Sequence, residues 1–210
     1  MDTNAADGRT ARSRATRARV ARAAAGLFAA RGYAATSVRS VADAAGVGEQ
    51  TVYYAFKTKA AVLAEAVDQA VAGDAEPVPT LERPWVREAL AAPDAEAQVR
   101  LHVAGTGAVM ERVAGLLEAV RGGAADPDLA RLWRANVEQR RAVQHVFADS
   151  LAARGALAPG LEAGEAADLM LGLLSPELFT LYTVHLGRSA RWWRERTTEA
   201  VRAQVLGAVP

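Results

Sequence analysis

The sequence predicts an all-α protein, and three observations support this prediction. Alanine is abundant and 51% of the 210 residues are hydrophobic, a composition that favours helix. No stretch alternates apolar and polar residues with the period of two that indicates a strand. Apolar residues instead recur at helical spacing between glycine and proline breaks, which divide the chain into about nine helices.

Residues 36–59 are the most informative stretch. Thr36 or Ser37 can cap a short helix, because a short hydroxyl accepts a hydrogen bond from a free backbone N–H. The apolar residues that follow lie at i, i+3, i+4 and i+7, on one helix face: Val38, Val41, Ala42 and Ala45. Gly46 is expected to end this helix in the left-handed conformation.

A second short helix is predicted from about Glu49 to Ala55, with Val52 and Phe56 facing inward. Two short helices joined by a tight turn that contains glycine form a helix-turn-helix. The outer face of the second helix then carries polar and aromatic residues: Gln50, Thr51, Tyr53 and Tyr54. In such motifs this face lies in the major groove of DNA.

The run from about Arg17 to Leu63 resembles the DNA-binding domain of the TetR family of transcriptional regulators. Two motif strings carry the resemblance: Ala24-x-x-Leu27-Phe28-x-x-x-Gly32-Tyr33-x-x-Thr36-Ser37-Val38 and Thr51-Val52-Tyr53-x-x-Phe56-x-x-Lys59-x-x-x-Leu63. They cover roughly a quarter of the chain. Gly48 departs from the pattern, since Ser or Thr often caps the recognition helix there. Glycine is still an acceptable cap.

The resemblance implies a sequence-specific transcriptional regulator, most often a repressor, released from an inverted-repeat operator on double-stranded DNA by a small-molecule effector. It implies a homodimer formed through the last two long helices. It also implies a protein of the bacterial cytoplasm that is associated with the nucleoid when bound to DNA. A DNA-binding architectural protein without ligand control is the alternative. It predicts a filled core and little sequence preference.

The predicted organisation has four parts. They are a flexible basic arm (1–12), the helix-turn-helix domain (13–58), a linking helix (59–75), and an effector-binding and dimerisation domain (76–210). Residues 1–60 carry ten Lys and Arg against four Asp and Glu, a net +6, which leaves the remainder at −5. This asymmetry favours a polyanionic partner for the first part, with a solvated arginine face as the alternative.

Eight residues are candidates for DNA contact: Thr36, Ser37, Arg39, Gln50, Thr51, Tyr53, Tyr54 and Lys59. Arg39 can present a fork to guanine, and Gln50 can reach base edges or phosphates. The hydroxyl of Tyr53 and the ammonium of Lys59 suit phosphates, which fix register without reading sequence. The resemblance implies DNA contacts at the positions of Thr51, Tyr53, Tyr54 and Lys59, with Tyr53 on a phosphate.

The rest of the chain reads as long helices. One follows Pro93-Asp94, with a bend or interruption possible at Gly105 and Gly107, and another follows Asp126-Pro127. An apolar helix is expected from about Glu162 to Leu186, with a kink or a short break at Pro176. Because it is apolar on all sides, a second copy of the chain is expected to cover part of it.

Bulky side chains of these helices are candidates for the lining of a ligand pocket, although for any single one plain core packing is the better interpretation. They are Trp85, His102, Met110, Trp133, Phe147, Met170 and Phe179. The resemblance implies that small, often apolar molecules bind in this part of the chain.

Several functions lack support in the sequence. There is no cysteine, no HExxH zinc motif, no phosphate-binding glycine loop and no G-x-S-x-G elbow, so we expect no enzyme, no metal and no cofactor. A helical enzyme with an unused DNA-binding domain would need a catalytic cluster that the residues do not provide. No apolar run approaches the roughly 20 residues that span a bilayer, so no membrane partner is expected.

Overall fold

The computed structural model describes residues 3–73 and 78–207, with side chains from Ser13 onward. Within these ranges the regular elements are all helical, which confirms the predicted fold class. The described β contacts amount to one isolated bridge between Leu157 and Leu206. No helix in the described part of the chain is long and apolar enough to cross a membrane.

The chain divides into two compact units. Residues 1–75 and 115–133 form the first unit, and residues 76–114 and 134–210 form the second. The sequence had assigned all of 76–210 to one domain, whereas the structure groups 115–133 with the helix-turn-helix. That grouping depends on contacts between residues far apart in sequence, which local patterns do not reveal.

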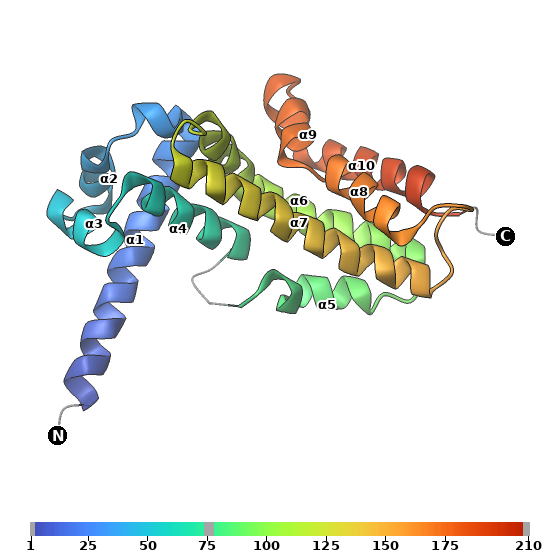
Figure 1. The fold of residues 1–210 in the computed structure, drawn as a ribbon, viewed down its shortest axis with the longest axis horizontal. Coiled ribbons are helices and arrows are strands. Elements are labelled where there is room, and N and C mark those ends of the chain that lie inside the picture. Colours follow the sequence, from blue (N-terminus) through green and yellow to red (C-terminus); the bar gives the residue numbers. More distant parts are fainter. Residues whose placement is uncertain (1–2, 74–77, 208–210) are drawn as a thin grey trace. The chain divides into compact units, whose positions relative to one another are not determined.

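Four helices open the first unit, with α2 and α3 as a short consecutive pair beside α1 (Figure 1). They are α1 (Thr3–Ala35), α2 (Val38–Ala45), α3 (Glu49–Phe56) and α4 (Lys59–Ala72). The helix α1 starts at Thr3, so most of the predicted irregular arm at 1–12 is helical. Arginine and alanine are strong helix formers, and a helix already nucleated further along the chain extends through them at little cost.

The core of the first unit combines apolar side chains from all four helices. Buried examples are Val20, Ala24, Phe28, Val41, Val52, Phe56 and Leu63. At Gly32 the backbone leaves the helical region (φ 73°, ψ 176°), a conformation essentially restricted to glycine. This break directs the last residues of α1 away from the helix axis and toward α2.

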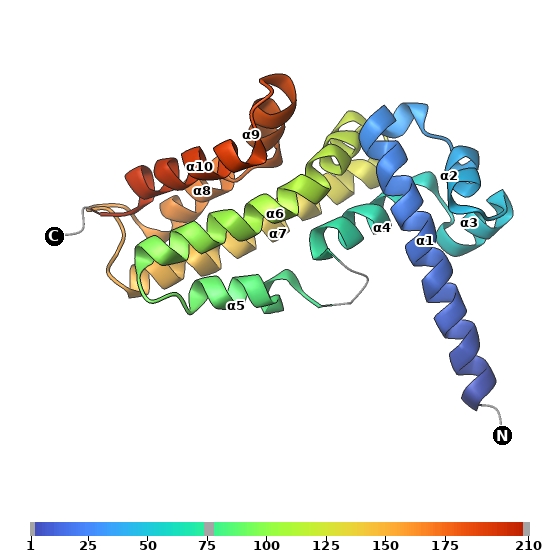
Figure 2. The same cartoon turned by 180° about the vertical axis from the view of Figure 1, so that it is seen from behind.

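The second unit contains helices of very different lengths. They are η1 (Thr80–Glu82), α5 (Pro84–Leu90), most of α6 (Ala95–Gly122), most of α7 (Pro127–Ala153), α8 (Ala163–Leu173), α9 (Pro176–Thr180), η2 (Leu181–His185) and α10 (Ala190–Val205). Helices α8 and α10 lie beside each other (Figure 2).

Helix α6 continues through both glycines at which the sequence allowed an interruption. A Cβ on Gly105 would lie 2.2 Å from Cε3 of Trp85, and one on Gly107 would lie 2.9 Å from Cγ of Arg194. The two glycines therefore let large side chains approach the helix closely, and their role is in packing.

The break predicted at Pro176 is confirmed. The expected single helix is divided into α8 and α9, and Ser175 caps α9 with Pro176 as its first residue. The segment that follows, η2, is π-helical. Ser189 caps α10, accepting a hydrogen bond from the backbone N–H of Trp192 at 3.1 Å.

Candidate DNA-binding surface

The local sequence fixes both ends of α2. Ser37 is its N-cap and accepts a hydrogen bond from the backbone N–H of Ser40 at 3.0 Å, while the Ser40 hydroxyl accepts one from the N–H of Ser37. Gly46 ends the helix in the left-handed conformation (φ 63°), and Val47 N donates to Ala42 O at 3.0 Å. These caps set the tight turn that leads into α3.

Helix α3 has one buried and one exposed face. Val52 and Phe56 are 1% and 4% exposed, whereas Tyr53 and Tyr54 are 46% and 83% exposed. Gln50 and Thr51 are exposed as well. Gly48 is the N-cap without a side-chain hydrogen bond, as its missing hydroxyl requires. Four side chains able to donate or accept hydrogen bonds thus lie on one open face, as a major-groove reader requires.

Two further candidates lie on or before α2. Arg39 is exposed. Thr36, in contrast, is 1% exposed, and its hydroxyl donates to Gly32 O at 2.8 Å. The Thr36 side chain therefore belongs to the interior of the unit. The Ser37 hydroxyl is exposed but engaged in the cap.

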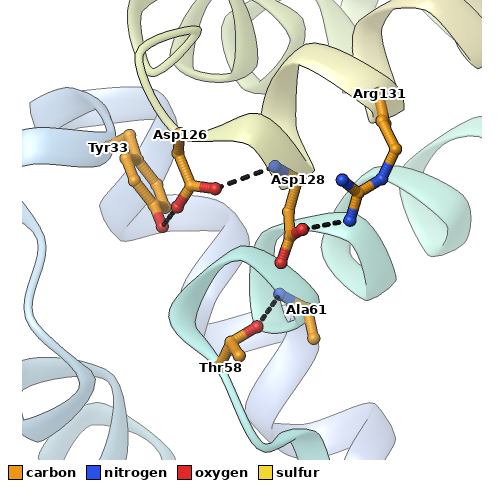
Figure 3. A network of polar contacts seen from close by, with 6 residues as sticks. All are labelled: Tyr33, Thr58, Ala61, Asp126, Asp128 and Arg131. Carbon is orange, nitrogen blue, oxygen red and sulfur yellow. Dashed lines mark hydrogen bonds and ion pairs between the residues drawn. The ribbon is translucent and has the colours of Figure 1, made fainter.

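Lys59 is half-buried at the start of α4 and already has partners. Its ammonium donates to Tyr33 O at 2.9 Å and to Thr36 O at 3.1 Å, and Nζ lies 4.0 Å from the centroid of the Tyr33 ring. An ammonium has three N–H donors, so one remains for an anion. Thr58, the residue before, caps α4 by accepting a hydrogen bond from the backbone N–H of Ala61 (Figure 3).

Lys57, immediately after α3, was not among the sequence candidates. It is exposed and has φ 67° and ψ −45°, and Thr58 N donates to Phe56 O at 2.8 Å across it. This is a classic γ-turn, which is strained for a residue with a Cβ and costs about 1–3 kcal/mol. Its ammonium lies 5.0 Å from the Tyr54 ring centroid. A lysine at the end of a predicted recognition helix was the available sequence signal.

Arg17 supports α3 from beneath. Its guanidinium donates to Ala55 O at 2.6 Å, pairs with Glu65, and lies 4.3 Å from the centroid of the Phe56 ring. The sequence counted Arg17 only as part of a basic segment. In the structure it joins α1, the end of α3, and α4.

Three of the predicted pocket residues form an aromatic stack in the second unit. The rings of His102 and Phe147 lie parallel with centroids 3.6 Å apart, and Trp85 lies 6.5 and 6.3 Å from them. His102 is 1% exposed, and burial lowers its pKa to about 3, so the ring is neutral. This stack lies on Gly105, the residue that admits Trp85.

The other four candidates are distributed differently. Met110 and Met170 are buried in the second unit, and Phe179 packs edge-on against Trp193 with centroids 5.1 Å apart. Trp133 is the last residue of the first unit and is half-buried. Trp193, which was not among the sequence candidates, is the largest fully buried side chain of the described residues.

Five buried side-chain atoms among the described residues lack a hydrogen-bond partner within the protein, and all belong to the second unit. They are His102 Nε2, Gln144 Oε1, Glu177 Oε2, Thr180 Oγ1 and Trp193 Nε1. Each such atom lowers the stability of the fold by about 1–3 kcal/mol unless a hydrogen-bond partner is supplied. No group of three or more His, Cys, Asp or Glu that could hold a metal occurs in the described part.

The caps, the tight turn and the exposed face of α3 define the first unit as a helix-turn-helix domain of the DNA-binding kind. Residues 20–66 match the family described as bacterial regulatory proteins, tetR family. The predicted resemblance is thereby confirmed, and the chain has the fold of TetR transcriptional regulators. No curated protein is significantly similar in sequence to the chain.

Solved structures with this fold match nearly the whole chain. A TetR-family transcriptional regulator from Mesorhizobium loti MAFF303099 is 24% identical with a TM-score of 0.71, covering 93% of this chain and 98% of its own. One from Rhodococcus sp. is 19% identical, with a TM-score of 0.70 and coverage of 90% and 97%. A complex of SmeT with triclosan is 18% identical, with a TM-score of 0.69 and coverage of 93% and 95%.

These identities are low, so the structures show a shared fold. The family matched by residues 20–66 consists of regulatory proteins, and the similar structures from Mesorhizobium loti and Rhodococcus sp. are described as transcriptional regulators.

Proposed function

We propose that the protein is a sequence-specific transcriptional repressor, released from an inverted-repeat operator by a small-molecule effector. The observation that carries the proposal is the outer face of α3, where Gln50, Thr51, Tyr53 and Tyr54 are exposed above a buried Val52 and Phe56. The net charge of +6 over residues 1–60 supports a polyanionic partner on this side. Such a protein would act in the bacterial cytoplasm and would be associated with the nucleoid when bound to DNA.

The exposed side chains divide into two groups by chemistry. Gln50, Thr51 and Arg39 have the donors and acceptors that read base edges. Tyr53 and Lys57 suit phosphates, which fix the register of α3 on the duplex. We propose that Tyr54 and Lys57 act together at the phosphate backbone of the DNA, because the Lys57 ammonium lies close to the Tyr54 ring.

Three sequence candidates keep narrower roles in the proposal. The Thr36 side chain is buried, so its contribution is to hold the residue before α2 in place. The Ser37 hydroxyl caps α2 and lies at its exposed start. Lys59 has one N–H left for a phosphate after its two bonds to carbonyls.

A homodimer is proposed because large apolar side chains stay exposed in one segment of the second unit. Leu169 of α8 is 37% exposed, while Leu181, Val184 and Leu186 of the η2 region are 42%, 70% and 57% exposed. A second copy of the chain would remove this apolar surface from water. Two-fold symmetry then predicts half-sites about one helical turn, roughly 34–36 Å, apart.

An effector is proposed to bind in the second unit, where the unpartnered buried atoms and the Trp85–His102–Phe147 stack lie. Trp193 Nε1 can only donate and Gln144 Oε1 can only accept, so an effector would need both acceptor and donor groups beside a flat apolar part. The SmeT complex contains triclosan. An effector can shift DNA binding by no more than its differential affinity for the two states.

The test is selection from a random duplex library with the wild type, Tyr53→Ala and Tyr53→Phe. We expect the wild type to recover an inverted repeat. Tyr53→Phe keeps the ring and should recover the same repeat with roughly tenfold weaker binding, because it loses only a phosphate hydrogen bond. Tyr53→Ala should bind more weakly still.

Recovery of no repeat by the wild type, with equal weak binding by all three proteins, would refute sequence-specific regulation. The architectural alternative would then hold. Circular dichroism of each variant serves as the control for folding.

A further inference from the structure

The corner between α6 and α7 joins the helix-turn-helix through one carboxylate. Oδ2 of Asp126 accepts a hydrogen bond from the Tyr33 hydroxyl at 2.8 Å, and Oδ1 accepts one from Asp128 N at 2.9 Å (Figure 3). Asp126 therefore caps the start of α7 and at the same time holds the end of α1. All three residues belong to the first unit.

The Tyr33 ring also contacts Lys59, the first residue of α4, and so links Asp126 to that helix. The Lys59 ammonium lies 4.0 Å from the ring centroid and bonds the carbonyls of Tyr33 and Thr36. A phenol that donates to a carboxylate has a more electron-rich ring, which attracts a cation more strongly. Burial and, after it, the hydrogen bond to Asp126 raise the pKa of Tyr33, and the same bond lowers the pKa of Asp126, so Tyr33 is neutral and Asp126 is charged.

Close packing leaves the corner little freedom to move. A Cβ on Gly123 would lie 2.4 Å from Cδ1 of Leu129 and 2.9 Å from Cδ1 of Tyr33. Leu129 is fully buried. A Cβ at position 123 would therefore require the side chain of Leu129 or Tyr33 to shift.

The contacts form a continuous chain of restraints around the DNA-reading pair. Asp126 fixes Tyr33, and Tyr33 with Lys59 fixes both Thr36, two residues before α2, and the first residue of α4. Helices α2 and α3 are the segment of chain between those two fixed points. The reading face of α3 is thus anchored at both ends of its segment.

We propose that Asp126 is a positioning residue for DNA binding, which sets the α2–α3 pair through Tyr33 and Lys59 without touching DNA. The inference rests on the proposed function. It assigns a role in DNA binding to a residue that the sequence placed in the effector-binding domain. The DNA partner is the operator duplex of the proposed function, and Asp126 affects the affinity for that duplex.

The experiment is a double-mutant cycle on the full chain with Tyr33→Phe, Asp126→Ser and the combination. Phenylalanine keeps the ring under Lys59, and serine keeps the cap of α7 but is too short to reach Tyr33. Operator affinity should fall about tenfold in each single variant, the effect of one charge-assisted hydrogen bond. The double variant should fall by the same factor.

A second readout separates positioning from a merely structural role. All variants should stay folded at the assay temperature, and the salt dependence of binding to random duplex should not change, because no phosphate contact is lost. Amide exchange over residues 38–56 of the free protein should be faster in both single variants.

Arg131→Gln is the matched control. It breaks the exposed Arg131–Asp128 ion pair one turn along α7 and leaves Tyr33 untouched, so operator affinity should stay within about twofold (Figure 3). Unchanged operator affinity in Tyr33→Phe and Asp126→Ser, or additive losses in the double variant, would overturn the inference. If the wild type selected an operator and these variants matched it, only the inference would fail. If the wild type selected none, the proposed function would fail, and amide exchange would still decide the positioning role.

Discussion

The buried histidine of the second unit makes the stability of the protein depend on pH in a specific way. His102 is 1% exposed and has a pKa of about 3 in the folded state, because burial penalises its charged form. In the unfolded chain its pKa is about 6.5. Between these values only the unfolded chain binds the proton, so acid favours unfolding.

The size of the pH effect depends on how far the pH lies below the pKa of His102 in the unfolded chain. The contribution of His102 to stability is fully present above pH 6.5 and falls by about 1.4 kcal/mol for each pH unit below it, until pH reaches about 3. At pH 4.5 the loss is about 2–3 kcal/mol. Carboxylates also titrate in this range, so the histidine is isolated by comparing variants.

The variant is His102→Phe, which keeps a flat ring against Phe147 and removes the titrating nitrogen. Urea unfolding followed by circular dichroism, at one ionic strength and protein concentration, gives the free energy of unfolding at pH 7.0, 6.0, 5.0 and 4.5. Between pH 7.0 and 4.5 the variant should lose about 2–3 kcal/mol less than the wild type. His185→Gln, which removes an exposed imidazole, should follow the wild type.

Identical pH slopes for the wild type and His102→Phe would refute the reasoning. They would mean that His102 is protonated in the folded protein, or that water reaches it. The assignment of a neutral His102 ring against Phe147 would then be wrong.

Three further predictions concern the dimer, the core and a helix cap. Val184→Asp places a charge on the most exposed apolar side chain of the η2 region and should convert dimer to monomer in sedimentation velocity at micromolar concentration. Gly105→Ala adds a Cβ 2.2 Å from the Trp85 ring and should lower the free energy of unfolding by about 1–3 kcal/mol, with changed tryptophan fluorescence. Ser37→Ala removes the α2 cap and should cost about 1 kcal/mol, a melting shift of about 2–4 °C.

Each of these changes has a matched control in the same chain. Val78→Asp alters another exposed valine and should leave the dimer intact. Gly26→Ala adds a Cβ with no atom within 4 Å and should be neutral or slightly stabilising. Ser13→Ala removes an exposed serine of α1 that caps no helix in the structure and should leave the melting temperature unchanged. If a control variant showed the same effect as the variant it is paired with, the cause stated for that variant would be wrong.

Local sequence predicted the helix ends well, because each is fixed by one or two neighbouring residues. Ser37, Gly46, Thr58 and Ser189 all occupy the cap positions that their chemistry indicates. The start of α1 was wrong, since a flexible arm was expected where arginine and alanine extend the helix to Thr3.

Residues whose role depends on distant partners were harder to interpret. Lys59 reads as a phosphate ligand in sequence, and only the fold shows that two carbonyls already hold it. Gly105 reads as a helix breaker, whereas its missing Cβ makes room for Trp85, twenty residues earlier. The contact between Asp126 and Tyr33 spans 93 residues and leaves no local signal at all.

The open face of α3 has an evolutionary consequence. Within the described residues, the side chains of Gln50, Thr51 and Tyr53 make no hydrogen bond to the rest of the protein, and the ring of the exposed Tyr54 lies 5.0 Å from the Lys57 ammonium. Substitutions at such positions usually change stability by less than about 0.5 kcal/mol. If α3 reads DNA as proposed, a lineage carrying this fold can therefore exchange one target sequence for another through intermediates that all stay folded. The buried side of the same helix, held by Arg17, remains fixed while it does so.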